Sequence, residues 1–141
     1  MLNKLGRLAP AAKAYELALS YLPKHYWISV TSCYQGLGLI YNKLGQLDQA
    51  RDAAENAARP HKTREGQNWW RIVWLQGEIA LESRDPRSAV QALGQVRDGF
   101  IELGNPLDLA LVSLRLVKAI SMAGQGGDHF RQARQVVSQE R

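Results

Sequence analysis

The amino-acid sequence predicts an all-α protein built as a solenoid of stacked helical hairpins. Apolar residues recur at intervals of three and four positions through successive segments, as on one face of a helix, and no segment shows sustained strand alternation. Turn residues also recur every 39 positions, at Gly6, Gly45 and Arg84. The first alanine of each following segment has the same spacing: Ala11, Ala50 and Ala89. Such self-similarity is typical of arrays in which each hairpin buries its core against its neighbours.

The first segment, residues 5–23, predicts the second helix of an incomplete hairpin. Gly6 is expected to form a turn, and Pro10 suits a first helical turn, where its missing N–H costs little. Pro23 is expected to stop the helix. The predicted apolar face consists of Ala11, Ala14, Tyr15, Ala18 and Leu22.

The second segment predicts a complete hairpin. Its first helix should run from Tyr26 to Lys43 and end at Gly45, and Asp48 is placed to cap or charge-stabilise the next helix. That second helix carries a face of small residues, which lets two helix backbones approach closely: Ala50, Ala54, Ala57 and Ala58. The polar residues 60–67 predict a loop.

The third segment predicts an interior helix over residues 68–83. One apolar stripe contains Trp70, Val73, Trp74, Gly77, Ala80 and Leu81, and a second contains Ile72, Leu75 and Ile79. A helix that is apolar on most sides is packed by neighbours on two sides. After a turn at residues 84–86, a longer helix should place Ala89, Leu93, Val96 and Phe100 inward, ending at residues 104–106.

The fourth segment predicts a mostly apolar helix from Leu107, a break at residues 124–127, and a last helix over about 129–139. The apolar face of that last helix would consist of Phe130, Ala133, Val136 and Val137. We therefore expect one domain over residues 1–141. It would comprise a partial repeat at 1–25, repeats at 26–65 and 66–104, and a weak repeat at 105–141.

Composition excludes several classes of function. The formal net charge is +5, but the basic residues are scattered and form no block, so the sequence argues against a nucleic-acid partner. The one cysteine, Cys33, cannot form an intrachain disulfide. No signal peptide and no apolar run of about 18 residues is present, which predicts a cytoplasmic protein without membrane contact.

The sequence predicts no catalytic residue, metal site or cofactor, and hence no enzyme. His25, His61 and His129 share no ligand spacing. Glu78 and Glu82 lie on one helix face, but they flank no nucleophile, so a solvated strip explains them.

The second segment resembles the tetratricopeptide repeat family. The family pattern is an aromatic-x-x-Leu-Gly-x-x-Tyr helix followed by a helix with spaced alanines. The residues that match it are Tyr34, Leu37, Gly38, Tyr41, Gly45, Ala50 and Ala57. The first segment matches at Ala11, Tyr15, Ala18 and Pro23, and the third matches less well. The period of 39 is longer than the family's usual length of about 34 residues, which resembles long-period bacterial arrays.

The resemblance implies a right-handed α–α superhelix whose first helices line a concave groove. It places Gln35, Leu39, Asn42 and Lys43 there from the second segment, and Arg71, Trp74, Glu78 and Glu82 from the third. The fourth would contribute Ser113, Val117 and Ser121. Gly36 stands where relatives that bind a C-terminal carboxylate have a polar side chain, so such a ligand is not expected.

The function implied is a non-catalytic scaffold that binds a protein or peptide. One alternative is a segment of a bacterial regulator that senses a ligand or peptide, and another is a basic helical binder of nucleic acid. Because solenoids need polar capping elements, we also expect the apolar ends to be covered by self-association or by flanking sequence.

Overall fold

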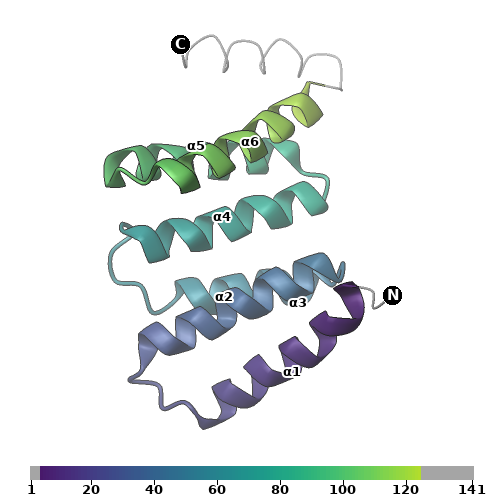
Figure 1. Ribbon diagram of the computed structural model, residues 1–141, viewed down its shortest axis with the longest axis vertical. Helices are drawn as coiled ribbons and strands as arrows, with labels where there is room; N and C mark the ends of the chain where they lie inside the picture. Colours follow the sequence, from purple (N-terminus) through teal and green to yellow (C-terminus); the bar gives the residue numbers. More distant parts are fainter. Residues whose placement is uncertain (1–3, 125–141) are drawn as a thin grey trace.

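The computed structural model describes residues 4–124, which form six α-helices and contain no strand. The helices are α1 (Lys4–Tyr21), α2 (Trp27–Lys43), α3 (Leu47–Ala58), α4 (Gln67–Glu82), α5 (Pro86–Leu103) and α6 (Pro106–Ala123). They follow one another along the long axis of the molecule, from α1 at one end to α6 at the other (Figure 1). The prediction of an all-helical fold is confirmed. The predicted last helix, over residues 129–139, lies outside the described residues.

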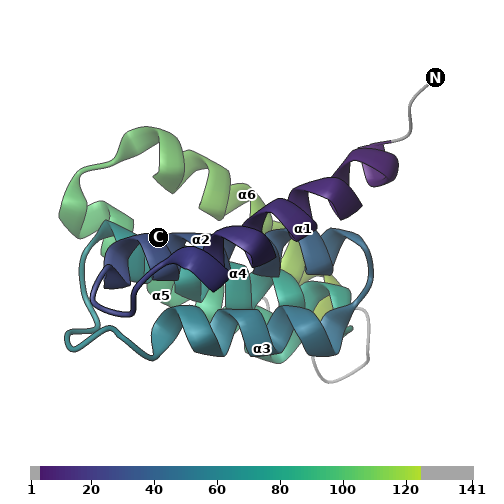
Figure 2. The ribbon, with the colours of Figure 1, turned by 90° about the horizontal axis from the view of Figure 1, so that it is seen from below.

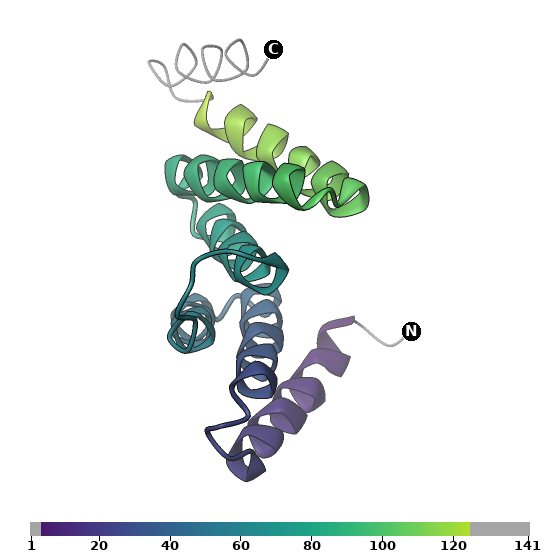
Figure 3. The ribbon, with the colours of Figure 1, turned by 90° about the vertical axis from the view of Figure 1, so that its left-hand side faces the viewer.

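Neighbouring helices in the chain are neighbours in space. The pairs α2–α3 and α4–α5 form hairpins joined by tight turns, α1 packs on α2, and α6 packs on α5. Helix α4 also contacts both α2 and α3, which joins the two hairpins (Figure 3). Along the stack, α1 crosses the other helices obliquely and its N-terminal end projects beyond them (Figure 2). This arrangement is a helical solenoid.

The turns inside the two hairpins share one backbone conformation. Gly45 has φ 78° and Arg84 has φ 58°, so both residues lie in the left-handed region that commonly ends helices. Arg84 is the only non-glycine residue of the described chain with a positive φ. The sequence predicts equivalent turns at these two residues, which are 39 positions apart. This is a single interval, and the period of the whole array stays a prediction.

The prediction for the first segment was wrong in three respects. Gly6 forms no turn, because α1 begins at Lys4 and continues through it, and Pro10 lies inside the helix rather than in its first turn. Pro10 removes one backbone hydrogen bond there, and because Gly6 and Pro10 are both exposed, water can solvate the freed carbonyl. The buried side of α1 is also rotated from the predicted face. Ala12 is its buried residue, while Ala14 is exposed.

Helix α4 is buried on two sides, as its two apolar stripes predicted. Leu75 and Ile79 pack against the alanine face of α3, where Ala50 and Ala54 are almost fully buried. Val73 and Leu81 belong to a larger cluster with residues of α5 and α6. That cluster contains Phe100, the largest fully buried side chain. Each stripe of α4 therefore supplies one wall of a separate core.

Two glycines allow these layers to approach closely. A Cβ atom on Gly38 of α2 would lie 2.5 Å from Leu75 Cδ2, and one on Gly77 of α4 would lie 2.8 Å from Leu93 Cδ2. Both distances are well below van der Waals contact, so the leucine side chains occupy the space that a larger residue would fill. Gly94 of α5, by contrast, has no neighbour within 4 Å of its hypothetical Cβ.

These contacts predict opposite effects for the same substitution. Gly38→Ala should lower the free energy of unfolding by about 1–3 kcal/mol, because the added methyl group overpacks the site of Leu75. Gly94→Ala is the matched control and should raise it by up to about 1 kcal/mol, because alanine favours a helix interior where space is open. Urea denaturation followed by tryptophan fluorescence measures both. Equal effects from the two variants would contradict close packing at Gly38.

Candidate binding surface

The predicted site residues of α2 differ in accessibility. Leu39 is 41% exposed and Lys43 is exposed, whereas Gln35 is half-buried. Asn42 is buried, with 8% exposure, and its Oδ1 has no hydrogen-bond partner. Leu39 and Lys43 are therefore the α2 residues that a partner could reach directly.

The α4 residues of the predicted site lie together on one side of that helix. Arg71 and Glu82 are exposed, and Glu78 is largely covered. Trp74 is half-buried, and its ring meets Phe100 edge-on at a centroid distance of 5.8 Å. The Trp74 indole Nε1 donates a hydrogen bond to Glu78 Oε1 at 3.2 Å. Trp74 thus helps to pack the core and also orients Glu78.

Glu78 joins α4 to α6. Arg115 Nε donates to Glu78 Oε1 and Arg115 Nη2 donates to Glu78 Oε2, each at 2.7 Å, so the guanidinium holds the carboxylate through two parallel bonds. About two turns before Glu78 on α4, Arg71 Nη2 lies 3.9 Å from Asp108 Oδ2. Asp108 also accepts a 2.7 Å hydrogen bond from Asn105 Nδ2 at the start of α6. The two ion pairs place part of the α6 surface next to the predicted residues of α4.

The hydrogen bond to Glu78 raises the pKa of Arg115 above its ordinary value, although partial burial opposes this effect. Arg115 is therefore a fixed cation at every accessible pH. Its charge is neutralised locally by Glu78, and Glu82 adds a weaker attraction.

Asp108 and Arg115 are not among the predicted site residues, although the sequence contains a signal for them. Arg71 and Glu78 are seven positions apart on α4, and Asp108 and Arg115 are seven positions apart on α6 with the opposite order of charges. Residues spaced by seven lie on the same helix face, so two such faces can pair charge by charge. Complementary charges at matching spacing are therefore the sequence signal for this ladder of two ion pairs.

The predicted site residues of α6 take no part in the two ion pairs with α4. Ser113 Oγ donates to the Leu109 carbonyl within α6, at 2.7 Å, and Val117 is 64% exposed. Ser121 is exposed. Within residues 4–124, no polar contact joins the α2 residues to those of α4 or α6. The structure thus brings Arg71, Trp74 and Glu78 together and leaves Gln35, Leu39, Asn42 and Lys43 as a separate group. We call Leu39, Lys43, Arg71, Trp74, Glu78, Glu82 and Arg115 the first-helix surface, because α2, α4 and α6 supply them. Val117 does not belong to it, since it is rotated by about 200° around α6 from Arg115.

Gly36, which departs from the pattern of carboxylate-binding relatives, has a structural role. A Cβ atom there would lie 2.5 Å from Tyr15 Cζ of α1. Tyr41, also of α2, donates its hydroxyl hydrogen bond to Glu16 of α1, which raises the pKa of Tyr41 to about 12. Helix α1 therefore packs against the face of α2 around Gly36.

Other candidate chemistry in the described residues is sparse. Residues 4–124 contain no cluster of three or more His, Cys, Asp or Glu side chains arranged to hold a metal ion. Cys33 is half-buried, and burial raises the pKa of its thiol, which disfavours the thiolate. None of the six described helices combines the length and apolar character that crossing a bilayer requires.

Stacked antiparallel hairpins with tight glycine and alanine contacts define a helical-repeat protein. Residues 31–59, which include most of α2 and all of α3, match the family model of the tetratricopeptide repeat. The hairpin α2–α3 is therefore a tetratricopeptide repeat, as its aromatic, glycine and alanine pattern predicted. No curated protein and no solved structure matches the chain significantly.

The ladder between α4 and α6 predicts a measurable coupling. In a double-mutant cycle, Glu78→Gln and Arg115→Gln should show a coupling energy of about 1 kcal/mol, because the pair is bidentate but its side chains are still 19% and 34% exposed. The same cycle on Arg71 and Asp108 is the matched control and should give a value near zero, since that pair is longer and Arg71 is more exposed. Urea unfolding of the single and double variants measures both cycles. Equal coupling in the two pairs would contradict a dominant Glu78–Arg115 contact.

Proposed function

We propose that this protein is a non-catalytic scaffold that binds a protein or peptide on its first-helix surface. The tetratricopeptide repeat at residues 31–59 supports an interaction role rather than a catalytic one, since repeats of this family generally mediate protein binding and are typically non-catalytic. The observation that carries the proposal is a mixed surface on alternate helices. It combines the accessible apolar side chain of Leu39 and the half-buried ring of Trp74 with the exposed charges Lys43 and Glu82.

The two ion pairs between α4 and α6 hold several polar side chains of this surface in place. Arg71 pairs with Asp108, and Glu78 pairs with Arg115. Lys43 and Glu82, by contrast, form no ion pair within residues 4–124. The two unpaired charges are thus the groups that can meet opposite charges on a partner. Leu39 and Trp74 supply apolar contact area, and aromatic residues are enriched among strong binding contacts.

A triple substitution tests this proposal. Leu39→Gln, Lys43→Gln and Glu82→Gln together should abolish the retention of proteins that the wild-type chain captures from an extract of the source organism, quantified by mass spectrometry. For a captured protein that is then purified, the dissociation constant should rise by about tenfold or more, because several accessible contacts are lost.

The matched control places the same three changes elsewhere, as Leu103→Gln, Lys13→Gln and Glu102→Gln, all at exposed positions. This variant should retain the same proteins as the wild type. Equal retention by the two triple variants would refute binding at the first-helix surface.

We further propose self-association through the ends of the stack. Helix α6 carries an aliphatic stripe directed away from the core, and its members are Leu107, Leu111, Leu114 and Val117, between 45% and 70% exposed. At the other end, Leu17 and Tyr21 of α1 are 59% and 79% exposed. Contiguous exposed apolar side chains of this kind mark interaction surfaces.

The stripe on α6 predicts association that depends on concentration. The wild-type chain should form dimers or larger species in sedimentation velocity experiments as its concentration rises through the micromolar range, whereas Leu107→Gln combined with Leu114→Gln should remain monomeric. Glu102→Gln, a nearby exposed position on α5, serves as the control and should associate like the wild type. A wild-type chain that stays monomeric at every concentration would rule out self-association by this route.

A further inference from the structure

A second groove lies on the other side of α4, between α3 and α5. It consists of two adjoining hollows, of about 280 Å³ and about 340 Å³. Both hollows are lined by Gln76 of α4 and Ser88 of α5, so they adjoin at these two residues and are described together as one depression. We call it the back groove. The α4 residues in its floor include Trp69, Val73, Gln76 and Ala80.

The back groove is distinct from the first-helix surface. At 3.6 residues per turn, successive residues are rotated by about 100°, so Val73, Gln76 and Ala80 lie about 140–160° around α4 from Glu78. Glu78 and its neighbours on α4 therefore face α6 and the first-helix surface, while Gln76 faces the opposite way. A molecule in one place does not compete for the residues of the other.

Each wall of the back groove is one regular helix face. Arg51, Ala54, Glu55 and Ala58 of α3 follow the spacing i, i+3, i+4, i+7, and Ser88, Gln91, Ala92 and Gln95 of α5 follow the same spacing. Both walls alternate small and polar side chains. The alanines leave the depression open, and the polar side chains border it.

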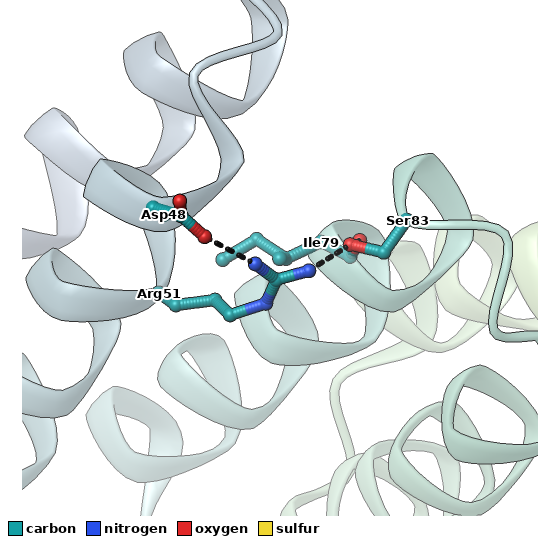
Figure 4. Close-up of polar contacts among 4 residues, drawn as sticks. All are labelled: Asp48, Arg51, Ile79 and Ser83. Atoms are coloured by element: carbon teal, nitrogen blue, oxygen red, sulfur yellow. Dashed lines mark hydrogen bonds and ion pairs between the residues drawn. The ribbon is translucent and has the colours of Figure 1, made fainter.

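At one end of the back groove, the guanidinium of Arg51 connects α3 to α4. Arg51 Nη1 lies 2.9 Å from Asp48 Oδ1, and Arg51 Nη2 donates to Ser83 Oγ at 2.8 Å (Figure 4). Ser83 Oγ in turn donates to the Ile79 carbonyl at 2.7 Å. This chain of contacts connects α3 to the C-terminal end of α4, so this end of the groove is held by both hairpins.

The other end of the back groove is bordered by ring side chains. The Arg64 guanidinium lies over the Trp69 ring, 5.8 Å from its centroid, and the His61 and Trp69 rings are 5.6 Å apart. Arg64 and Trp69 both line the larger hollow. The groove therefore ends on an aromatic face that is covered by a cation.

Between these ends, the back groove is lined by three glutamine side chains. Gln76, Gln91 and Gln95 are exposed, and none of their side chains has a hydrogen bond within residues 4–124. Each primary amide offers an acceptor and two donors, which is the complement of a peptide group with one N–H and one C=O. We propose that the back groove binds an extended, uncharged polypeptide segment through the backbone amides of that segment.

The dimensions fit such a segment. Side chains at i and i+4 on a helix are about 6 Å apart, as are Gln91 and Gln95, and alternate residues of an extended chain repeat at about 6.6 Å. One amide can therefore meet every second peptide group. The α5 wall from residue 85 to residue 95 is about 15 Å long at 1.5 Å per residue, which accommodates about four or five extended residues.

The charges favour an uncharged segment over a nucleic acid. Two arginines, Arg51 and Arg64, line the hollows together with two acids, Glu55 and Asp85, so the formal charges cancel. Asp85 is also occupied, because it accepts hydrogen bonds from the backbone N–H and the hydroxyl of Ser88. A polyanion would gain no net attraction in this groove, since phosphate recognition depends on an excess of basic side chains.

The test uses a displayed library of 12-residue peptides, selected on the full chain. Fluorescence anisotropy of selected synthetic peptides should give a dissociation constant that rises about tenfold or more in Gln91→Ala combined with Gln95→Ala, which removes two hydrogen-bonding side chains. Alanine at these exposed helical positions preserves the fold. Methylation of alternate backbone nitrogens in the peptide should weaken binding to a similar extent.

Two controls separate this proposal from the proposed function. Gln49→Ala, at an exposed position of α3 outside the groove, should bind the peptides like the wild type. The triple variant at Leu39, Lys43 and Glu82 should also bind them normally. Selected peptides that lose affinity only in the triple variant would overturn the back groove and support the first-helix surface. The absence of any enriched peptide would overturn it too, as would a labelled single-stranded oligonucleotide that binds and is lost in the double glutamine variant.

Discussion

The structure depends on the burial of α4 from two directions. Leu75 and Ile79 fit against the alanines of α3 on one side, and Val73 and Leu81 join the cluster around Phe100 on the other. Neither core can form without α4, so the two hairpins are stable only as neighbours, as expected when each repeat buries its apolar face on the next. The small residues make this possible. Gly38 admits Leu75 between α2 and α3, and Gly77 admits Leu93 of α5.

Opposite faces of the same helix consequently serve different purposes. The apolar stripes of α4 hold the stack together, while the polar positions between them emerge on its two sides. Glu78 reaches Arg115 on one side, and Gln76 borders the back groove on the other. Two candidate surfaces thus arise from one helix because 3.6 residues per turn distribute its sixteen residues around the whole circumference. The tetratricopeptide repeat at residues 31–59 supplies the α3 wall of the second surface.

Much of the fold could be predicted because its determinants are local. Gly45 and Arg84 mark helix ends through a backbone conformation that short-range sequence can signal, and the two stripes of α4 require only periodicity. Gly6 misled the prediction because a glycine can also remain helical when the chain continues on both sides of it. The site was harder to predict, since burial is set by neighbours that a single helix does not reveal. Asn42 is covered although its position in the repeat suggested a groove, and Trp74 contributes its ring to the core. Arg115 was missed because its partner lies 37 residues away.

The ladder between α4 and α6 also has a consequence for the rate at which a partner arrives. Its two cations and two anions lie next to one another, so their fields largely cancel beyond a Debye length of about 8 Å at physiological ionic strength. A partner approaching the first-helix surface therefore meets little long-range attraction, and its association should proceed near the unsteered rate of about 10⁵–10⁶ M⁻¹s⁻¹ with a weak dependence on salt. Tight binding at such a surface has to come from a long residence time, which is governed by the short-range contacts that Leu39 and Trp74 provide.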